Sequence, residues 1–268
     1  MRRAADSAIT CLYHYEAFNR DRLKDTLINQ RVHFSSPQHF NDPWDCHPWF
    51  DATEVLDPVL RSKWVRFLER HLTADQEQTL AAKYFVWQED IPFLQRTIGH
   101  MIDSIWQLNA DRWRMYCLTP HPTSVLMWSH YGDKHRGLCL EFDATAAVIG
   151  RALQVRYQEN LPAISASSFD DWGAIAPSIL LDKSIVWAYE DEYRVLARDS
   201  KADALPTDFL PVTGKDFLPL PVGALTAVIA GCNADLDAVT SIVQAHAPSI
   251  RVQRCVRAHN KYALSIEA

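Results

Sequence analysis

The sequence lacks the short motifs by which several protein classes are recognised. Its six cysteines stand singly, without a Cys-x-x-Cys pair, so we expect neither a zinc ribbon nor a thioredoxin-type redox site. Neither Gly-x-Gly-x-x-Gly nor Gly-x-x-x-x-Gly-Lys occurs, which argues against a Rossmann dinucleotide site and against a P-loop. No internal repeat or low-complexity tract stands out.

Long apolar runs are missing as well. The first ten residues include two arginines, but no apolar stretch follows them, so no secretory signal peptide is expected. No run approaches the roughly 20 apolar residues that a membrane-spanning helix needs. We therefore expect a soluble, cytoplasmic protein with reduced thiols.

A concentrated basic charge is also absent. The formal net charge is −6, and the lysines and arginines are spread along the chain. Duplex nucleic-acid binding through a general electrostatic footprint is therefore not expected. A local basic rim around a pocket remains compatible with this distribution.

The chain is long and apolar enough to bury a sizeable core. It has 268 residues, of which 48% are hydrophobic, and we expect a single domain over residues 1–268. Nine tryptophans recur beside charged residues. They could line a pocket that stacks planar ligands, or they could form part of the core.

Hydrophobic periodicity predicts an α+β fold with a mixed, mostly antiparallel sheet core. Alternating residues predict strands at 11–15, 31–35, 113–118, 137–142, 152–157, 192–197, 225–230 and 251–256. Helical spacing predicts helices at 18–28, 170–182 and 234–246, a short one within 124–133, and a helical insert over about 54–108. Gly231 is expected to end a strand, and Asn233 is expected to cap the following helix.

Four segments carry a resemblance to a known family. They are LYHY at 12–15 with the following RVHFSSPQHFNDPWD, LMWSHYGDKHRGLCLEFD at 126–143, KSIVWAYEDEYR at 183–194, and the strand end at 228–231. In this combination the chain resembles the bacterial family of domains of unknown function numbered 2971. The resemblance also implies a place in a bacterial defence or toxin system.

A second likeness is to the ADP-ribosyltransferase superfamily. A strand with His14, a helix, a strand and a later glutamate follow one another in the same order. Glu192-Tyr-Arg-Val is similar to the Glu-Tyr-x-Val of the poly-ADP-ribose polymerases, and Glu190-Asp-Glu has the Glu-x-Glu form of the arginine-modifying branch. The resemblance implies an ADP-ribosyltransferase-like fold and NAD as a substrate. The middle-motif tyrosine of that superfamily has no clear counterpart.

The likeness implies that Glu192 is the catalytic carboxylate and Glu190 its support. If both lie on a strand, they face the same side and Asp191 faces the other. A fixed carboxylate stabilises the positive charge that develops on ribose when the bond to nicotinamide breaks. The alternative is a solvated acidic strand end that Arg194 and Lys183 balance. In the catalytic interpretation, Glu192→Gln should leave stability nearly unchanged.

The remaining residues of the expected NAD site are His14, Tyr13, Ser35, Tyr131, His135 and Arg136. His14 would hold the ribose at the adenosine end, as the resemblance implies, or it is a structural histidine. Tyr131 is expected to form a pocket wall, whereas Trp128 is expected in the core. His135 and Arg136 could reach an anionic group such as a pyrophosphate, or they lie in an exposed turn.

The stretch from His33 to His47 is rich in His, Asp and Cys, but its spacing matches no metal-ligand framework. We expect no metal cofactor. Asn41 and Asp42 are expected to bond backbone amides and to hold the loop in shape.

Three functions remain open from the sequence. The first is an ADP-ribosyltransferase-like enzyme that uses NAD and a protein or nucleic-acid acceptor. The second is a non-enzymatic binding or regulatory module of a defence system. The third is a hydrolase or nuclease built on the loop between His33 and His47. A cleft shared by His14 and Glu192 would support the first, in which Glu192 is the key carboxylate and His14 holds the ribose, and their placement on opposite faces would end it.

Overall fold

The computed structural model describes residues 2–47, 49–71, 90–169, 179–199, 209–212 and 216–267. The chain divides into two compact units. The first comprises Met1–His39, Trp113–Val155 and Val186–Ala268, and the second comprises Phe40–Arg112 and Arg156–Ile185. Each unit is described by itself.

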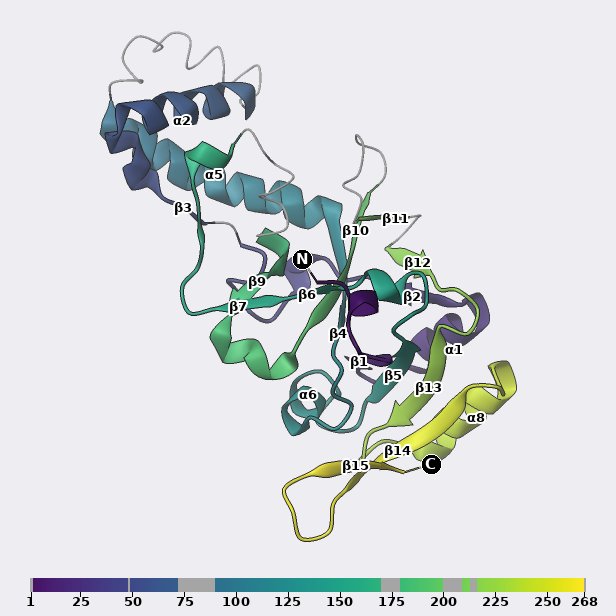
Figure 1. Ribbon diagram of the computed structural model, residues 1–268. Coiled ribbons are helices and arrows are strands. Elements are labelled where there is room, and N and C mark those ends of the chain that lie inside the picture. The colour runs from purple at the N-terminus through teal and green to yellow at the C-terminus, as the bar shows by residue number, and fades with distance from the viewer. Residues whose placement is uncertain are drawn as a thin grey trace. The chain divides into compact units, whose positions relative to one another are not determined.

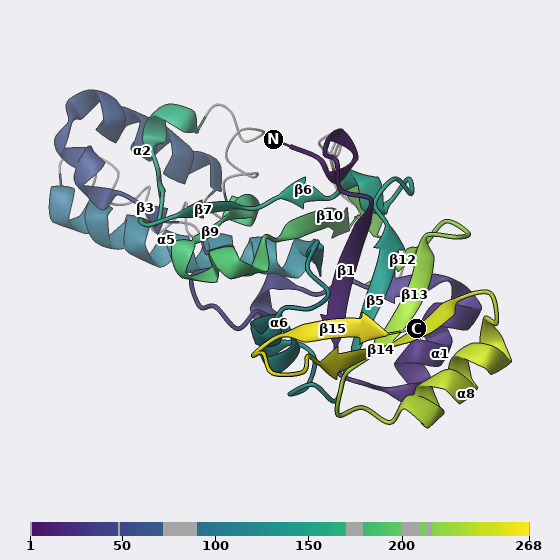
Figure 2. The ribbon, with the colours of Figure 1, turned by 60° about the horizontal axis from the view of Figure 1, so that its bottom comes forward.

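A five-stranded sheet forms the centre of the first unit (Figures 1 and 2). Its strand order is β1-β5-β13-β14-β15, with antiparallel pairs except for the parallel pair β13–β14. The strands are β1 (Cys11–Glu16), β5 (Leu138–Asp143), β13 (Leu225–Ala230), β14 (Arg251–Arg257) and β15 (Leu264–Glu267). Side chains alternate between the two faces of this sheet, so each strand places residues on both faces.

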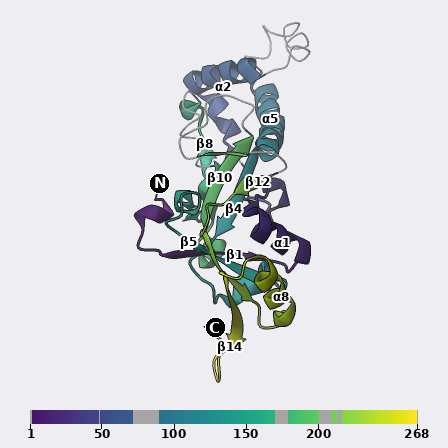
Figure 3. The same ribbon diagram turned by 90° about the vertical axis from the view of Figure 1, so that its right-hand side faces the viewer.

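Two helices cover one face of this sheet. They are α1 (Arg20–Asn29) and α8 (Leu236–His246), which Figures 2 and 3 show together on the same side. Each begins at a side-chain cap: Asn19 accepts from the amides of Asp21 and Arg22, and Asp235 accepts from the amide of Ala238. The prediction that Asn233 caps this helix was therefore wrong, because the cap is Asp235, two residues later.

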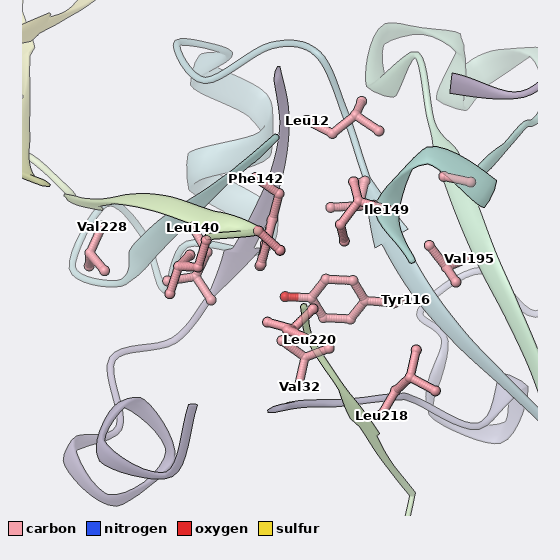
Figure 4. Close-up of a cluster of buried hydrophobic side chains, with 14 of the residues drawn as sticks. Leu12, Val32, Tyr116, Leu140, Phe142, Ile149, Val195, Leu218, Leu220 and Val228 are labelled. Carbon is pink, nitrogen blue, oxygen red and sulfur yellow. The ribbon is translucent and has the colours of Figure 1, made fainter. Parts of the chain in front are cut away.

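The main core lies between α1, α8 and this sheet face. Leu12, Leu140, Phe142 and Val228 are among the buried side chains that the sheet supplies (Figure 4). Burying apolar surface of this kind is the principal stabilising contribution, at about 25 cal/mol per Å².

A second sheet of the first unit has the order β11-β10-β4, with β6 also paired to β10. These strands are β4 (Trp113–Leu118), β6 (Leu153–Gln154), β10 (Tyr193–Asp199) and β11 (Leu210–Val212). The two sheets meet where Tyr13 of β1 exchanges backbone hydrogen bonds with Thr119, just after β4. Strands β2 (Arg31–His33) and β12 (Phe217–Pro219) pair separately. Short helices occur at α6 (Val125–His130), η1 (Ala4–Asp6), η2 (Pro37–His39), η4 (Ile149–Arg151) and η6 (Ile185–Glu190), which begins at the last residue of the second unit.

The second unit is mostly helical. It contains η3 (Ala52–Leu56), α2 (Pro58–His71), α5 (Ile91–Arg112), η5 (Ala166–Ser168) and the short strands β3 (Trp49–Phe50), β7 (Arg156–Gln158), β8 (Ala163–Ile164) and β9 (Asp182–Ser184). Rings of Phe50, Trp64, Phe67 and Phe169 pack together in its core. The expected helical insert thus corresponds to η3, α2 and α5, and its residues 72–89 lie outside the described residues.

The predicted fold class is confirmed: the protein is a mixed α+β structure with mostly antiparallel pairs. Strands 113–118 and 225–230 have the predicted bounds. The single strand expected at 152–157 was wrong, because it divides into β6 and β7, which pair with different partners. Most of the helix expected at 170–182 lies outside the described residues. No helix in the described part of the chain is long and apolar enough to cross a membrane.

Candidate functional site

The three acidic residues 190–192 lie on a turn and not on a strand. Glu190 is the last residue of η6, and β10 begins only at Tyr193. Between them Asp191 adopts a left-handed conformation with φ of 42°. Its carboxylate accepts from Gln154 Nε2 and lies 3.2 Å from His121 Nε2. The strand-like alternation expected for these residues was therefore wrong, because a left-handed residue interrupts it.

Glu192 forms a buried ion pair with Arg194. Arg194 Nε and Nη2 donate to the two carboxylate oxygens of Glu192 at 2.8 and 2.9 Å. Arg194 is fully buried and Glu192 is only 4% exposed. Of the alternative in which Arg194 balances a solvated acidic strand end, the pairing with Arg194 is present, but the pair is buried and not solvated. Two parallel charge-assisted hydrogen bonds fix this carboxylate in place and neutralise it.

Glu190 contacts the segment 126–143, the second of the four segments that carry the family resemblance. The hydroxyl of Tyr131 donates to Glu190 Oε1 at 2.6 Å, and Glu190 is 2% exposed. Tyr131 follows α6 directly, and that helix begins at Ser124, whose hydroxyl accepts from the amide of Met127. The fold thus joins two motifs that lie almost sixty positions apart in the sequence.

An aromatic cluster lies beside this contact and consists of His130, Trp187 and Tyr189. The ring centroids are 6.2 Å apart for His130–Trp187, 6.4 Å for His130–Tyr189 and 6.0 Å for Trp187–Tyr189. His130 is exposed and the other two rings are half-buried. The face of an aromatic ring attracts a cation that lies within about 6 Å of the ring centroid.

Tyr13, Tyr131 and Tyr189 share one sheet face. All three pack against a buried cluster that consists of Tyr15, Met127, Trp128, Cys139, Ile229 and Cys255. Trp128 is fully buried, as expected from the sequence. This is the face of the five-stranded sheet that α1 and α8 do not cover, and we call it the tyrosine face.

At Gly137 the chain passes very close to the backbone of β1. Gly137 precedes β5 and follows the turn after α6, and a Cβ atom there would lie 2.2 Å from the carbonyl oxygen of Glu16. Since no larger residue fits so close to the backbone of β1, glycine allows α6 to return directly into the sheet.

His14 lies on the opposite face from Tyr13. Its ring stacks on Tyr116 with centroids 4.1 Å apart, and its Nδ1 donates to the carbonyl oxygen of Cys117 at 2.8 Å. Burial lowers the pKa of His14 to about 4, so the ring is neutral at pH 7.

This placement separates His14 from Glu192. Tyr193 and Val195 lie in the main core with Tyr116, so Arg194, between them on β10, points to the other side of its sheet. Glu192 is bonded to Arg194 and lies on that side. The structure therefore does not bring His14 and Glu192 into one cleft.

The other residues expected to bind the cofactor are Ser35, His135 and Arg136. Ser35 pairs through its backbone with Met115. His135 Nε2 lies 3.2 Å from Ser129 Oγ, and its ring stacks above Trp128. Arg136 is exposed and donates to Asp133 at 3.0 Å.

His135 belongs to an unusual turn. Three consecutive residues, Asp133, Lys134 and His135, have φ between 45° and 66°. Left-handed residues rarely follow one another, because each costs roughly 1 kcal/mol or more. His135 and Arg136 therefore lie in a turn, in which Arg136 is exposed and His135 is half-buried.

Glu141 was not singled out from the sequence, yet it gathers polar groups on the tyrosine face. Tyr13 Oη donates to it at 3.2 Å and Thr226 Oγ1 at 2.6 Å, and Arg251 Nη2 is also bonded to it. Glu141 is 7% exposed, and burial raises the pKa of Tyr13 well above its usual range. A charged residue within the apolar run LCLEF was the signal that could have marked it.

In the second unit, Asp42 has the structural role expected for it. Its Oδ1 accepts from the amide of Trp44 at 2.9 Å. Asp45 accepts from the Cys46 thiol and lies 3.5 Å from Lys183 Nζ. Among the described residues no three His, Cys, Asp or Glu side chains come together as a metal site would require.

We expect Asp42→Ala to lower the free energy of unfolding by about 1 kcal/mol, the usual loss when a side chain stops capping a backbone amide. Thermal denaturation measures the change, and Asp42→Asn, which keeps the acceptor, should behave like the wild type. Unchanged melting of the alanine variant would show that this hydrogen bond does not hold the loop.

The comparisons with known proteins bear on this region. The sequence model of a family described as "Protein of unknown function (DUF2971)" matches residues 127–195. This span runs from α6 to β10 and includes Tyr131, Trp187, Glu190 and Glu192. Searches of curated proteins and of solved structures found no match. The match supports the family resemblance for the segment that builds the aromatic cluster and both carboxylates.

Proposed function

We propose that the aromatic cluster and Glu190 bind the nicotinamide end of NAD, and that the protein is an ADP-ribosyltransferase-like enzyme. The observation that carries the proposal is the meeting of Tyr131 and Glu190, at 2.6 Å, beside the rings of His130, Trp187 and Tyr189. The nicotinamide ring of NAD is a planar pyridinium cation. Aromatic faces and a carboxylate both attract such a ring, and the attraction grows where water is excluded.

The reaction needs a carboxylate near the ribose. The bond between the nicotinamide nitrogen and the ribose carbon breaks, and its electron pair leaves with nicotinamide. The carbon becomes oxocarbenium-like, and the Glu190 carboxylate stabilises that charge. A nucleophile of the acceptor, or water, then forms the new bond and releases its proton to solvent. The acceptor is a protein or a nucleic acid.

We propose that the two glutamates have the opposite roles to those that the resemblance implied. Glu192 is held bidentately by Arg194, which neutralises it and fixes its orientation. Glu190 accepts from the hydroxyl of Tyr131, which follows His130 of the aromatic cluster. Glu190 itself follows Tyr189 of the same cluster in the chain. We therefore assign the reacting carboxylate to Glu190 and a structural role to Glu192. His14 is not part of this site.

Calorimetry with NAD and NADH tests the binding. The dihydronicotinamide ring of NADH is neutral, so the two ligands differ in the charge that the aromatic cluster recognises. We expect NAD to bind more tightly than NADH, and Trp187→Ala to remove the difference while Trp187→Phe retains much of it. Equal affinity for both ligands, or no binding of either, would contradict the proposal.

Release of nicotinamide tests the reaction. Glu190→Gln keeps the shape of the side chain but removes its charge. The rate should fall on the order of a hundredfold or more, as when one preorganised electrostatic group is lost elsewhere. The assay is run with water alone and with protein and nucleic-acid acceptors. An undiminished rate in Glu190→Gln would move the reacting carboxylate elsewhere.

Tyr131→Phe is expected to lower the free energy of unfolding by about 1.5–3 kcal/mol, since it removes a hydrogen bond to a buried carboxylate. Chemical denaturation measures the loss. Tyr262→Phe is the matched control, because Tyr262 is fully exposed and its hydroxyl should contribute nothing. Equal stability of the two variants would mean that the Tyr131 hydroxyl does not support Glu190.

A binding module without catalysis is the second candidate. The separation of His14 from Glu192 and the ion pair of Glu192 with Arg194 favour it, because both residues then have structural roles. Its signature is tight binding of NAD with no release of nicotinamide under any acceptor condition.

A further inference from the structure

The hairpin formed by β14 and β15 carries four lysine and arginine residues and one acidic residue, Glu267 at the end of β15. Between residues 251 and 263 it carries Arg251, Arg254, Arg257 and Lys261, and no aspartate or glutamate. The whole chain has a formal net charge of −6. This hairpin therefore concentrates positive charge on an otherwise acidic protein.

Most of this charge is available to a partner. Arg251, Arg254, Arg257 and Lys261 are all exposed. Arg251 is bonded to Glu141, and Arg254 Nη2 donates to the carbonyl oxygen of Cys232 at 3.3 Å. Arg257 and Lys261 have no ion-pair partner within the ranges that the structure describes.

The loop at the end of the hairpin also presents an aromatic ring. Tyr262 lies between β14 and β15 and is fully exposed. Figure 1 shows this loop projecting beyond the end of the sheet. Burying an exposed tyrosine is favourable for a partner with planar groups, because bases stack on aromatic side chains in a sequence-tolerant way.

Protection of a sheet edge explains only part of this pattern. Edge strands often carry charge that prevents pairing with other chains. The edge strand is β15, yet residues 264–267 contain no lysine or arginine. On β14, Arg251 has no partner on β15 and Arg257 has none on β13, so both are edge positions, whereas Lys261 and Tyr262 lie in the loop outside these strand pairs.

The spacing of the charges suits an extended polyanion. Arg251 and Arg257 lie on the same side of β14 as Cys255, because side chains alternate along a strand. At about 3.3 Å per residue they are roughly 20 Å apart, with Lys261 and Tyr262 beyond them. A line of positive charges ending in an exposed ring matches a single strand with phosphates and unpaired bases.

We infer that the β14–β15 hairpin binds single-stranded nucleic acid, with Arg257 and Lys261 on phosphates and Tyr262 stacked on a base. The inference goes beyond the proposed function and does not depend on it, because binding is measured without NAD. If both hold, nucleic acid is the class of acceptor that this protein recruits.

Fluorescence anisotropy with a labelled 20-nucleotide oligo(U) and oligo(dT) tests the inference. Arg257→Glu/Lys261→Glu should raise Kd at least tenfold, and Tyr262→Ala should raise it several-fold while Tyr262→Phe does not. The matched control is Arg66→Glu/Arg96→Glu, which makes the same charge change at exposed positions of α2 and α5. All variants change exposed residues, and circular dichroism checks that they fold.

The salt dependence gives a second readout. Each phosphate contact with a single strand contributes about 0.7 to the slope of log Kd against log salt. Loss of two contacts should therefore lower the slope by about 1.4. No binding by the wild type at low salt, equal weakening in the control variant, or an unchanged slope in the hairpin variant would each overturn the inference.

Discussion

Glu192→Gln is expected to lower the free energy of unfolding by about 3–5 kcal/mol, the cost of breaking a buried ion pair on one side. The guanidinium of Arg194 is fully buried and loses the charge that its Nε and Nη2 contact at 2.8 and 2.9 Å. This expectation replaces the one drawn from the sequence, in which Glu192 was the catalytic carboxylate and its replacement by Gln left stability nearly unchanged. Urea denaturation followed by circular dichroism measures the change.

Two control variants make this test specific. Glu192→Gln combined with Arg194→Met should regain much of the loss, since the double variant removes both charges of the pair. Asp133→Asn breaks the exposed pair with Arg136 and should cost less than about 1 kcal/mol. If Glu192→Gln alone is as stable as Asp133→Asn, the pair with Arg194 is not what fixes Glu192.

Local periodicity predicted those elements that keep one strand partner along their whole length. The run at 113–118 alternates and pairs along its whole length with β10, and its bounds were predicted correctly. The run at 152–157 alternates as well, but the amide of Val155 bonds to the carbonyl oxygen of Glu192 between two different pairings. Which strand a segment pairs with is decided by contacts that are distant in sequence, so periodicity alone cannot show the break.

The candidate site was predictable in its residue types but not in its arrangement. Tyr131, Glu190 and Glu192 stood out through the motifs that contain them. Asp191 is left-handed, and Arg194 turns back to Glu192. Both features follow from packing around the turn and not from residue preference. The sequence also did not show which face of β1 the helices cover. Tyr13 and His14 are neighbouring aromatic residues of one strand, and they differ in the face of the sheet on which they lie.

The covered side of β1 contains a buried polar group that the proposed function does not use. Glu16 ends β1 with its side chain 10% exposed, and its nearest cation is Arg22 at 3.8 Å. Nearby, the hydroxyl of Tyr116 is buried without a hydrogen-bond partner among the described residues and points toward Leu140, Phe142 and Leu220 (Figure 4). Burial raises the pKa of Glu16 to about 7, although Arg22 opposes the shift.

The raised pKa of Glu16 predicts a definite pH dependence. A carboxyl whose pKa is higher in the folded than in the unfolded protein favours folding while it is protonated. Its contribution is complete below pH 4.5 and is lost as the pH rises through about 7. The difference between these values corresponds to roughly 3 kcal/mol. His14 acts in the opposite direction, since its pKa is about 4 in the fold and its contribution is lost as the pH falls below 6.5.

Glu16→Gln is therefore compared with the wild type at each pH, so that the contribution of His14 cancels. The variant should match the wild type at pH 4 and be more stable by roughly 3 kcal/mol at pH 8, where the wild type must bury a carboxylate. Asp25→Asn is the control of opposite sign: the hydrogen bond from Arg31 lowers the pKa of Asp25, so this variant should be less stable than the wild type at pH 8. Urea denaturation at both pH values measures the differences. A Glu16→Gln protein that is less stable at pH 8 would mean that the attraction of Arg22 outweighs burial, and that Glu16 is held as an ion pair.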